Sequence, residues 1–358
     1  MCQRDNSPAA DSKIEYIISV LNRIGYGVDH ISRAPSSCKH FIPYYIEHNG
    51  NNTIRYFASL GKTKSMLRVL NRLFMDAQFF LWCLFHVKKG EQIIVYHSLG
   101  YSTFFINLCR LKKVRIIGEI EEIYQDVHKQ RKSLARNEYR FIDVCDKYIF
   151  PTSLLNDKVN KNGKPYIVVH GVYSVENLIE GKNEDGKIHI VYGGTLDPNK
   201  GGAAAAVAAA EFLSENYHVH ICGFGDPSEI KTIIKEVSLR AKANVTFEGE
   251  LKGNAYKHFI QRCHIGLSTQ NPNAAFNATS FPSKILVYLS NGLKVVSIRI
   301  LAIEQSAVAS SIFFYDIQEP KAIAEAIEKA VETQLDGRDV LKELDKIFKE
   351  KLKTLITQ

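Results

Sequence analysis

Glycine-containing turns follow three strands that the sequence predicts in the second half of the chain. They are Gly193-Gly194, Gly223-Phe224-Gly225 and Gly249. Ligands of open parallel sheets bind at the carboxyl ends of the strands, and a glycine there lets the backbone approach a phosphate group closely. The three turns therefore indicate a phosphorylated ligand, with tight strand-to-helix turns as the purely structural alternative.

Two lysines stand where a helix should begin, at a place where the helix dipole disfavours a cation. Lys200 precedes an Ala-rich run, and Lys284 follows the Ser- and Pro-containing segment 279–283. A bound diphosphate would remove the cost, and the hydroxyls of Ser280 and Ser283 could then hold phosphate oxygens. The alternatives are a solvated loop lysine at position 200 and an ordinary helix cap in the second segment.

Carboxylates gather at the end of one predicted strand in the first half. Glu119, Glu121 and Glu122 close the run VRIIGE and begin a loop. Such a group could orient or deprotonate an acceptor hydroxyl, and His97, at the end of another strand, is a second candidate. The carboxylates could equally be solvated or pair with the basic residues 112–115, and a lone histidine could be hydrogen-bonded structure.

The elements that must position these residues alternate between strands and helices in the second half. This alternation indicates βαβ units and a parallel sheet covered on both faces. We expect strands at 187–192, 217–222, 244–247, 264–268 and 293–297, and helices at 202–216, 228–241, 256–262 and 282–289.

The first half repeats the pattern less clearly. No strand precedes the first helix, because residues 4–12 are typical of a loop, so the opening strand is expected to be missing or very short. We expect strands at 27–32, 92–97, 114–119, 147–151 and 166–170, and helices at 14–24, 65–87, 103–111 and 135–145.

Length and composition suit two domains. A chain of 358 residues is too long for one ordinary core. We place an N-terminal domain at 1–171, a second domain at 172–336, and a C-terminal helix at 337–358 that could cross back to the first domain. No run of about 20 apolar residues predicts a transmembrane helix, and the N-terminus lacks the apolar core of a secretory signal.

Seven scattered cysteines, none in a Cys-x-x-Cys spacing, favour reduced thiols. They argue against both a zinc site and a disulfide framework. The sequence therefore predicts a cytoplasmic protein.

The positive charge is concentrated in the first half. Lys and Arg outnumber Asp and Glu by 25 to 15 over residues 1–175, whereas the remainder holds 21 against 23. A basic surface can meet an anionic membrane or an acidic substrate, or have no partner at all. No nucleic-acid-binding signature is present, so we expect no nucleic acid. Residues 64–89 mix Leu, Phe and Trp82 with basic ends, which suits either a membrane surface or a buried helix.

The run YGGTLDPNKGG, followed by CGFGD, FEGEL and NATSFPSKILVYLSNGLKVVS, resembles the donor half of retaining GT-B glycosyltransferases of family 4. The FPSK segment is similar to that of members that build bacterial capsule and O-antigen polysaccharides. The first half is more loosely similar to those enzymes, through KIEYIISVLNRIGYGV, IIVYHSLGY and GEIEEIYQDV.

The resemblance implies an α/β fold of two facing Rossmann-like domains with parallel sheets and an interdomain cleft. A nucleoside diphosphate sugar, linked to UDP or GDP, would lie in the second domain. A lipid-linked saccharide acceptor would lie in the first, at the inner face of the cytoplasmic membrane. The implied reaction transfers a hexose or N-acetylhexosamine with retention of configuration. It requires neither a cofactor nor a metal, and the chain has no Asp-x-Asp pair to hold one.

The candidate site residues combine the patterns above with the resemblance. For catalysis we expect Lys200, Lys284, Glu121 and His97. For donor binding we expect Gly194, Thr195, Gly223, Gly225, Glu250, Leu251, Asn277, Ser280, Phe281, Pro282 and Ser283. On the acceptor side we expect Glu119, Glu122, Asn6 and Ser7.

One departure from the family pattern leaves alternatives open. The family commonly has two glutamates eight residues apart in this loop, where this chain has Thr279 and Val287. The second glutamate normally binds the ribose hydroxyls, which a valine cannot do. A nucleotide-sugar epimerase of the same fold and a catalytically degenerate protein that binds a sugar or a partner are the other interpretations.

Overall fold

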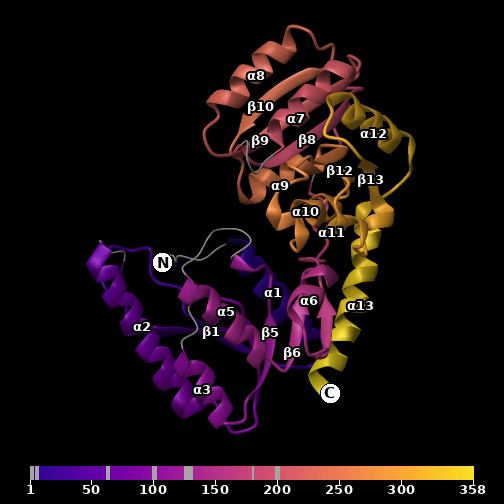
Figure 1. Ribbon diagram of the computed structural model, residues 1–358. Coiled ribbons are helices and arrows are strands. Elements are labelled where there is room, and N and C mark those ends of the chain that lie inside the picture. The colour runs from indigo at the N-terminus through magenta and orange to yellow at the C-terminus, as the bar shows by residue number, and fades with distance from the viewer. Residues whose placement is uncertain are drawn as a thin grey trace. The chain divides into compact units, whose positions relative to one another are not determined.

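The structure is a computed structural model that describes residues 4, 8–61, 65–98, 103–124, 132–179, 181–197 and 202–358. The chain divides into two compact units. Unit 1 comprises Met1–Phe150, Asn156–Val172 and Phe348–Gln358, and unit 2 comprises Pro151–Leu155 and Tyr173–Ile347. Each unit is described by itself (Figure 1).

Unit 1 is built on a parallel sheet of four strands in the order β4-β5-β6-β7. The strands are β4 (Gln92–Tyr96), β5 (Arg115–Glu119), β6 (Lys147–Phe150) and β7 (Tyr166–Val168). The helices are α1 (Pro8–Arg23), α2 (Ser65–His86), α3 (Thr103–Leu111) and α5 (Lys132–Val144). Residues of α6 (Ser153–Val159) and α13 (Gly337–Thr357) are divided between the two units.

Unit 1 also contains a second, smaller sheet of three strands, which the sequence did not predict. The predicted strand 27–32 forms as β1 (Asp29–Ser32), but it pairs with β3 (Asn52–Tyr56) rather than with the four-stranded sheet. β2 (Tyr45–Asn49) and β3 form an antiparallel hairpin that the analysis missed. Gly50-Asn51 is the two-residue loop of this hairpin, because Asn49 pairs with Asn52, and Gly50 has a φ of 56°.

Unit 2 contains a parallel sheet of six strands in the order β10-β9-β8-β11-β12-β13. The strands are β8 (Ile188–Thr195), β9 (Tyr217–Phe224), β10 (Asn244–Gly249), β11 (Ile265–Ser268), β12 (Lys294–Ile298) and β13 (Ile312–Tyr315). The chain extends outwards from β8 in one direction and then from β11 in the other. This is the Rossmann strand order, in which ligands bind where the order reverses, here at the carboxyl ends of β8 and β11.

Helices pack on the sheet of unit 2, with α7 beside α8 and α12 against β12 and β13 (Figure 1). Their apolar residues recur at helical spacing, as in α12, where Ile323, Ile327 and Ala330 are buried. The helical segments are α7 (Ala203–Ala208), η1 (Ala209–Phe212), α8 (Ser228–Ser238), α9 (Gly253–Gln261), η2 (Ala275–Ala278), α10 (Lys284–Ser290), α11 (Leu301–Glu304), η3 (Ala309–Ser311) and α12 (Pro320–Glu332).

The predicted helix 202–216 is shorter than expected. It ends as the 3-10 turn η1, where Ala209 and Ala210 are fully buried and η1 packs against α12. Small side chains allow this close packing, which here overrides the high helix propensity of alanine.

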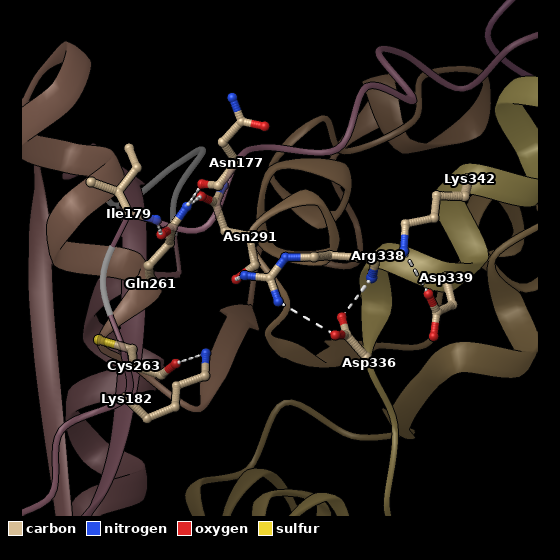
Figure 2. A network of polar contacts seen from close by, with 10 residues as sticks. All are labelled: Asn177, Ile179, Lys182, Gln261, Cys263, Asn291, Asp336, Arg338, Asp339 and Lys342. Atoms are coloured by element: carbon tan, nitrogen blue, oxygen red, sulfur yellow. Dashed lines mark hydrogen bonds and ion pairs between the residues drawn. The ribbon is translucent and has the colours of Figure 1, made fainter.

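A polar network braces the end of α10 (Figure 2). The buried Gln261 side chain donates from Nε2 to Asn177 O (2.8 Å) and to Asn291 Oδ1 (3.0 Å), and its Oε1 accepts from Ile179 N (2.8 Å). Arg338, near the start of α13, donates to Asn291 O (3.1 Å). Asn291 directly follows α10. These contacts therefore connect the end of the helix that carries Lys284 to the segment 177–179 and to the start of α13.

One cysteine corrects an expectation. Cys38 is disulfide-bonded, so the chain is not free of disulfides. Cys83, Cys109, Cys145, Cys222 and Cys263 are free and buried, as expected for structural thiols.

No helix within the described residues is long and apolar enough to cross a membrane.

Candidate functional site

The carboxyl ends of β8 and β9 approach each other through glycine backbones. Gly194 pairs with Gly223 in the parallel register, and Thr195 pairs with Phe224. A Cβ atom at Gly223 would lie 2.0 Å from the Gly194 carbonyl oxygen, which leaves no space for a side chain. Gly225 has a φ of 117°, a conformation that glycine adopts without strain. Two of the predicted donor glycines therefore have structural reasons to be glycine.

The end of β11 is equally crowded, because Gly202 packs against Thr269 there, a contact that the sequence did not predict. The Gly202 backbone lies so close to Thr269 that a Cβ atom there would be 1.7 Å from the Thr269 carbonyl oxygen. Thr269 Oγ1 also donates to Gly202 O (2.8 Å). The start of α7 is thus fixed against the strand that borders the reversal of strand order.

Lys284 reaches from α10 to the end of β8. Its Nζ atom lies 4.2 Å from the centre of the Tyr192 ring and 3.1 Å from the place that a Cβ of Gly194 would occupy. The Tyr192 hydroxyl is itself fixed, because it donates to Thr195 O (2.9 Å) and accepts from Gly202 N (3.1 Å). The structure therefore brings three of the predicted residues together: Lys284, Gly194 and Thr195.

The Lys284 ammonium is costly for the folded protein. Burial lowers its pKa from 10.5 to about 8. No carboxylate among the described residues forms an ion pair with it, although the Tyr192 ring gives partial compensation. A buried cation without a counterion gains most from an anionic ligand.

Two hydroxyl groups just before α10 are also without partners. Thr279 Oγ1 and Ser280 Oγ are buried, and neither has a hydrogen-bond partner in the described part of the chain. The backbone of this loop is held by Thr152 Oγ1, which donates to Thr279 O (2.6 Å). Buried hydroxyls are normally satisfied, so these two point to a ligand with acceptor oxygens. Thr279, which stands where the family has a glutamate, had not been counted among the site residues.

Other predicted donor residues have roles within the protein. Thr195 Oγ1 accepts from Asp197 N (3.1 Å), and Asn277 Nδ2 donates to the carbonyls of residues 271 (2.8 Å) and 272 (3.1 Å). Glu250 is exposed and pairs with Lys252 (2.9 Å). Phe281 is buried, whereas Leu251 and Pro282 are partly exposed and Ser283 is exposed.

Val287 lies on α10 with its side chain 37% exposed. An apolar, exposed side chain at this place supplies no hydrogen bond to a ribose. Lys200, Asn6 and Ser7 lie outside the described residues.

In unit 1 the carboxylates at the end of β5 meet a lysine from α1. Lys13 Nζ is 2.7 Å from Glu121 Oε1 and 3.8 Å from Glu119 Oε1, and it donates to Val169 O (2.9 Å). Burial and the neighbouring Glu121 raise the pKa of Glu119. Although burial acts in the opposite direction, Lys13 lowers the pKa of Glu121. Of the two, Glu119 is therefore the carboxyl that is easier to protonate.

The partner of these carboxylates is thus Lys13 rather than the basic run 112–115. Lys112 instead donates to the carbonyls of residues 83, 84 and 87 near the end of α2. The burial of Lys13 could have been inferred from its spacing in the sequence. It lies at helical spacing from Ile17 and Val20, which are buried, so it stands on the apolar face of α1.

His97 is buried beside the same group. Its backbone N–H donates to Glu119 O (2.8 Å), and its Nε2 lies 3.5 Å from Glu138 Oε1. Burial lowers the pKa of His97 to about 4, so the ring is neutral near pH 7. His97 and Glu119 both line a hollow of about 1220 Å³ within unit 1, together with residues of α1, β1, α2 and β4.

Comparisons with known proteins agree with this architecture. Residues 187–333, less than half of the chain, match the family model described as glycosyl transferases group 1. A search of curated proteins finds no match.

Solved structures that are similar to this chain cover most of its length at low identity. The α,α-trehalose 6-phosphate synthase of Burkholderia multivorans is 12% identical with a TM-score of 0.55, over 99% of this chain and 96% of that one. A glycosyltransferase of Rickettsia africae is 13% identical with a TM-score of 0.54, over 97% and 90%. The lipopolysaccharide outer core galactosyltransferase WaaB in its apo form is 16% identical with a TM-score of 0.56, over 82% of each chain.

The fold is that of GT-B glycosyltransferases. The predicted α/β fold with parallel sheets in two Rossmann-like units is confirmed, and the matched region together with the fold supports a glycosyltransferase. The matched region contains β8, β9 and α10, and with them Gly194, Gly223 and Lys284.

Proposed function

We propose that the chain transfers a hexose or N-acetylhexosamine from a nucleoside diphosphate donor bound at the carboxyl ends of β8 and β11. The observation that carries the proposal is the partly buried Lys284 ammonium, which has no carboxylate partner among the described residues and lies beside the glycine turn of β8. Together with the unpaired hydroxyls of Thr279 and Ser280, it offers one cation and two donors to a diphosphate.

The chemistry required of these groups is stabilisation of a leaving group. The bond between the anomeric carbon and the diphosphate oxygen breaks, and its electron pair stays on that oxygen. The Lys284 ammonium then stabilises the new negative charge, which is stronger than that of the bound donor. The acceptor hydroxyl forms the new bond to the anomeric carbon from the face that the diphosphate leaves, and its proton passes to the departing phosphate oxygen. We expect retention of configuration without a metal.

The acceptor side is proposed to lie in the hollow of unit 1. Glu119 lines this hollow and Glu121 is its neighbour across Lys13, so carboxyl oxygens of this pair could orient sugar hydroxyls by hydrogen bonding. Glu122 borders the pair along the chain. We propose a saccharide acceptor because hydroxyl-rich ligands suit such polar groups, and a lipid anchor because of the adjoining surface of α2.

The surface of α2 combines apolar and basic groups. Leu73 is 60% exposed and Phe85 76% exposed, and Arg68 and Arg72 are exposed on the same helix. A helix that exposes these apolar side chains and presents Arg68 and Arg72 at the hollow is suited to an anionic lipid surface. Co-sedimentation with vesicles of anionic or neutral lipid tests this part, and we expect binding to the anionic vesicles only. Binding unchanged in the double variant L73D/F85D would contradict it.

Activity is tested with a panel of UDP- and GDP-linked sugars and a lipid-diphosphate saccharide acceptor, by measuring release of the nucleoside diphosphate and labelling of the acceptor. We expect acceptor-dependent labelling with one donor and its loss in Lys284→Met. Conversion of the donor without any acceptor would support the epimerase alternative instead.

Val287 favours a second candidate, a degenerate protein that binds its ligand without turnover. The exposed valine provides no group for the ribose. Binding of UDP or GDP without transfer to any acceptor would support this candidate, and gain of transfer in Val287→Glu would identify the missing carboxylate as its cause.

A further inference from the structure

Three histidines gather on one face of the unit 2 sheet, in the amino-terminal half of β8 and β9. His189 of β8 stands opposite His218 of β9 in the parallel register, and His220 follows two residues later, so all three side chains share a face. One ring nitrogen from each lies within 4.8 Å of the others. His189 and His220 are buried, and their rings stack with centroids 5.1 Å apart.

The carboxylate contacts of the two buried rings leave one nitrogen of each ring facing the other. His189 Nε2 is 2.9 Å from Asp185 Oδ1, and His220 Nδ1 is 2.8 Å from Glu248 Oε1. Each of these nitrogens faces a carboxylate, and we assign its ring the tautomer with the proton there. The other two nitrogens, His189 Nδ1 and His220 Nε2, then face each other with their lone pairs at 2.8 Å. Two lone pairs at this distance repel unless a proton or a metal ion lies between them.

We propose that His189, His218 and His220 bind a divalent transition metal of the zinc class. Imidazole nitrogens suit such ions, and two of the three rings already have the carboxylate partners that orient metal-binding histidines. A tetrahedral ion with Zn–N bonds of about 2.0–2.1 Å spaces its ligand nitrogens at roughly 3.3 Å. The site thus needs His189 and His220 to separate by about half an ångström and His218 to turn towards them.

The surroundings allow entry of the ion and a fourth ligand. The histidines line a hollow of about 420 Å³ together with Glu184, Glu248 and Arg262. A water from this hollow or an oxygen of Glu248 would complete the coordination. His218 Nε2 now lies 3.0 Å from Thr246 Oγ1, a neutral partner that it can exchange for the metal.

The metal would stabilise the sheet rather than take part in sugar transfer. His189 is the second residue of β8 and Gly194 the seventh, so the cluster lies roughly 16 Å along the strand from the proposed donor site. Its ligands join β8 to β9, and Glu248 adds β10. The inference does not depend on the proposed function, because it is tested by metal binding alone.

The amino-acid sequence contains a weak signal for this site. His218-Val219-His220 has the alternation that places both imidazoles on one face of a strand, but the pairing with His189 requires the register of the sheet. Cysteine spacing, on which the expectation of no zinc site rested, carries no information about a histidine site.

The test uses the full chain produced without a histidine tag and treated with a chelator. Titration with Zn²⁺ should show one ion per chain, and Co²⁺ should give the visible absorption of a tetrahedral ion. We expect His189→Gln and His220→Gln each to weaken Zn²⁺ binding at least 100-fold, and Glu248→Gln to weaken it about 10- to 100-fold. The matched control is His40→Gln, an exposed histidine in unit 1, which should bind as the wild type does.

Several results would overturn the proposal. One is the absence of stoichiometric Zn²⁺ binding by the wild-type chain at micromolar concentration, and another is unchanged binding by the double variant H189Q/H220Q. A nitrogen-detected NMR spectrum showing one proton shared between His189 Nδ1 and His220 Nε2 in the presence of excess Zn²⁺ would also refute it. If the variants fail to fold, the decision rests on the wild type alone, where a rise in the unfolding temperature with Zn²⁺ supports the site and no change contradicts it.

Discussion

Replacing Lys284 by Met should make the protein more stable while weakening binding of its ligand. The change removes the ammonium but keeps an unbranched side chain of similar length against Tyr192. Burial lowers the pKa of Lys284 from 10.5 to about 8, which corresponds to about 3 kcal/mol of unfavourable burial at pH 7. The lost attraction to the Tyr192 ring offsets part of this, so we expect a gain of about 1–3 kcal/mol.

The sign of the pH dependence follows from the same shift. Below pH 8 the lysine is charged in both the folded and the unfolded chain, and the whole cost of burial is present. Between about pH 8 and 10.5 the unfolded chain binds more protons, so wild-type stability rises with pH through this group. The advantage of Lys284→Met should therefore be full at pH 7 and shrink steadily towards pH 10.

Urea unfolding of both proteins at pH 7 and pH 9.5, followed by a probe in unit 2, measures the difference. Lys252→Met is the matched control, because Lys252 is an exposed lysine of the same unit, 76% exposed, and should change stability by less than about 0.5 kcal/mol. Calorimetry with UDP and GDP should show at least a tenfold loss of affinity in Lys284→Met alone. A variant that is less stable than the wild type, or one that binds nucleotide unchanged, would refute the reasoning.

Three further predictions concern pH, packing and charge. Affinity for a nucleoside diphosphate should be constant from pH 7 to about 8. Above that pH it should fall by up to about tenfold per pH unit, because Lys284 loses its proton. Calorimetry that shows constant affinity up to pH 9.5 would contradict this. Gly223→Ala should destabilise unit 2 by about 2 kcal/mol or more, because its Cβ would lie 2.0 Å from a carbonyl oxygen of β8. Gly181→Ala, with nothing within 4 Å of its Cβ, should be nearly neutral in the same urea titration. Lys13→Met should cost about 3–5 kcal/mol at pH 7 by leaving the buried carboxylate pair without its cation. Adding Glu121→Gln should recover part of that loss, and no recovery would place the cost in packing instead.

The architecture of unit 2 could be predicted because its signals are local. Three of its strands, β8, β9 and β10, close with a glycine turn, and the turns at Gly193-Gly194 and Gly223 mark the carboxyl ends of adjacent strands. Lys284 stood out because a cation is unfavourable at a helix start, and the structure finds it beside Gly194. Local rules suffice for the strands and turns, whereas the placing of β11 beside β8 follows from the general strand order of such folds.

The features that escaped prediction depend on contacts between distant residues. Lys13 reaches Glu121 only because α1 packs on the carboxyl end of β5, and the unpaired hydroxyl of Thr279 becomes visible only when its neighbours are known. The β2–β3 hairpin was missed despite its Gly50-Asn51 loop because a parallel lobe was expected there. The histidine cluster requires the register between β8 and β9, which no single segment encodes.

A crystal structure of the full chain with bound UDP or GDP tests the central claim most directly. The account predicts the terminal phosphate beside Gly194, with an oxygen about 3 Å from Lys284 Nζ and hydrogen bonds from the hydroxyls of Thr279 and Ser280. A nucleotide bound away from the ends of β8 and β11, with the Lys284 ammonium paired to a carboxylate of the protein, would contradict it.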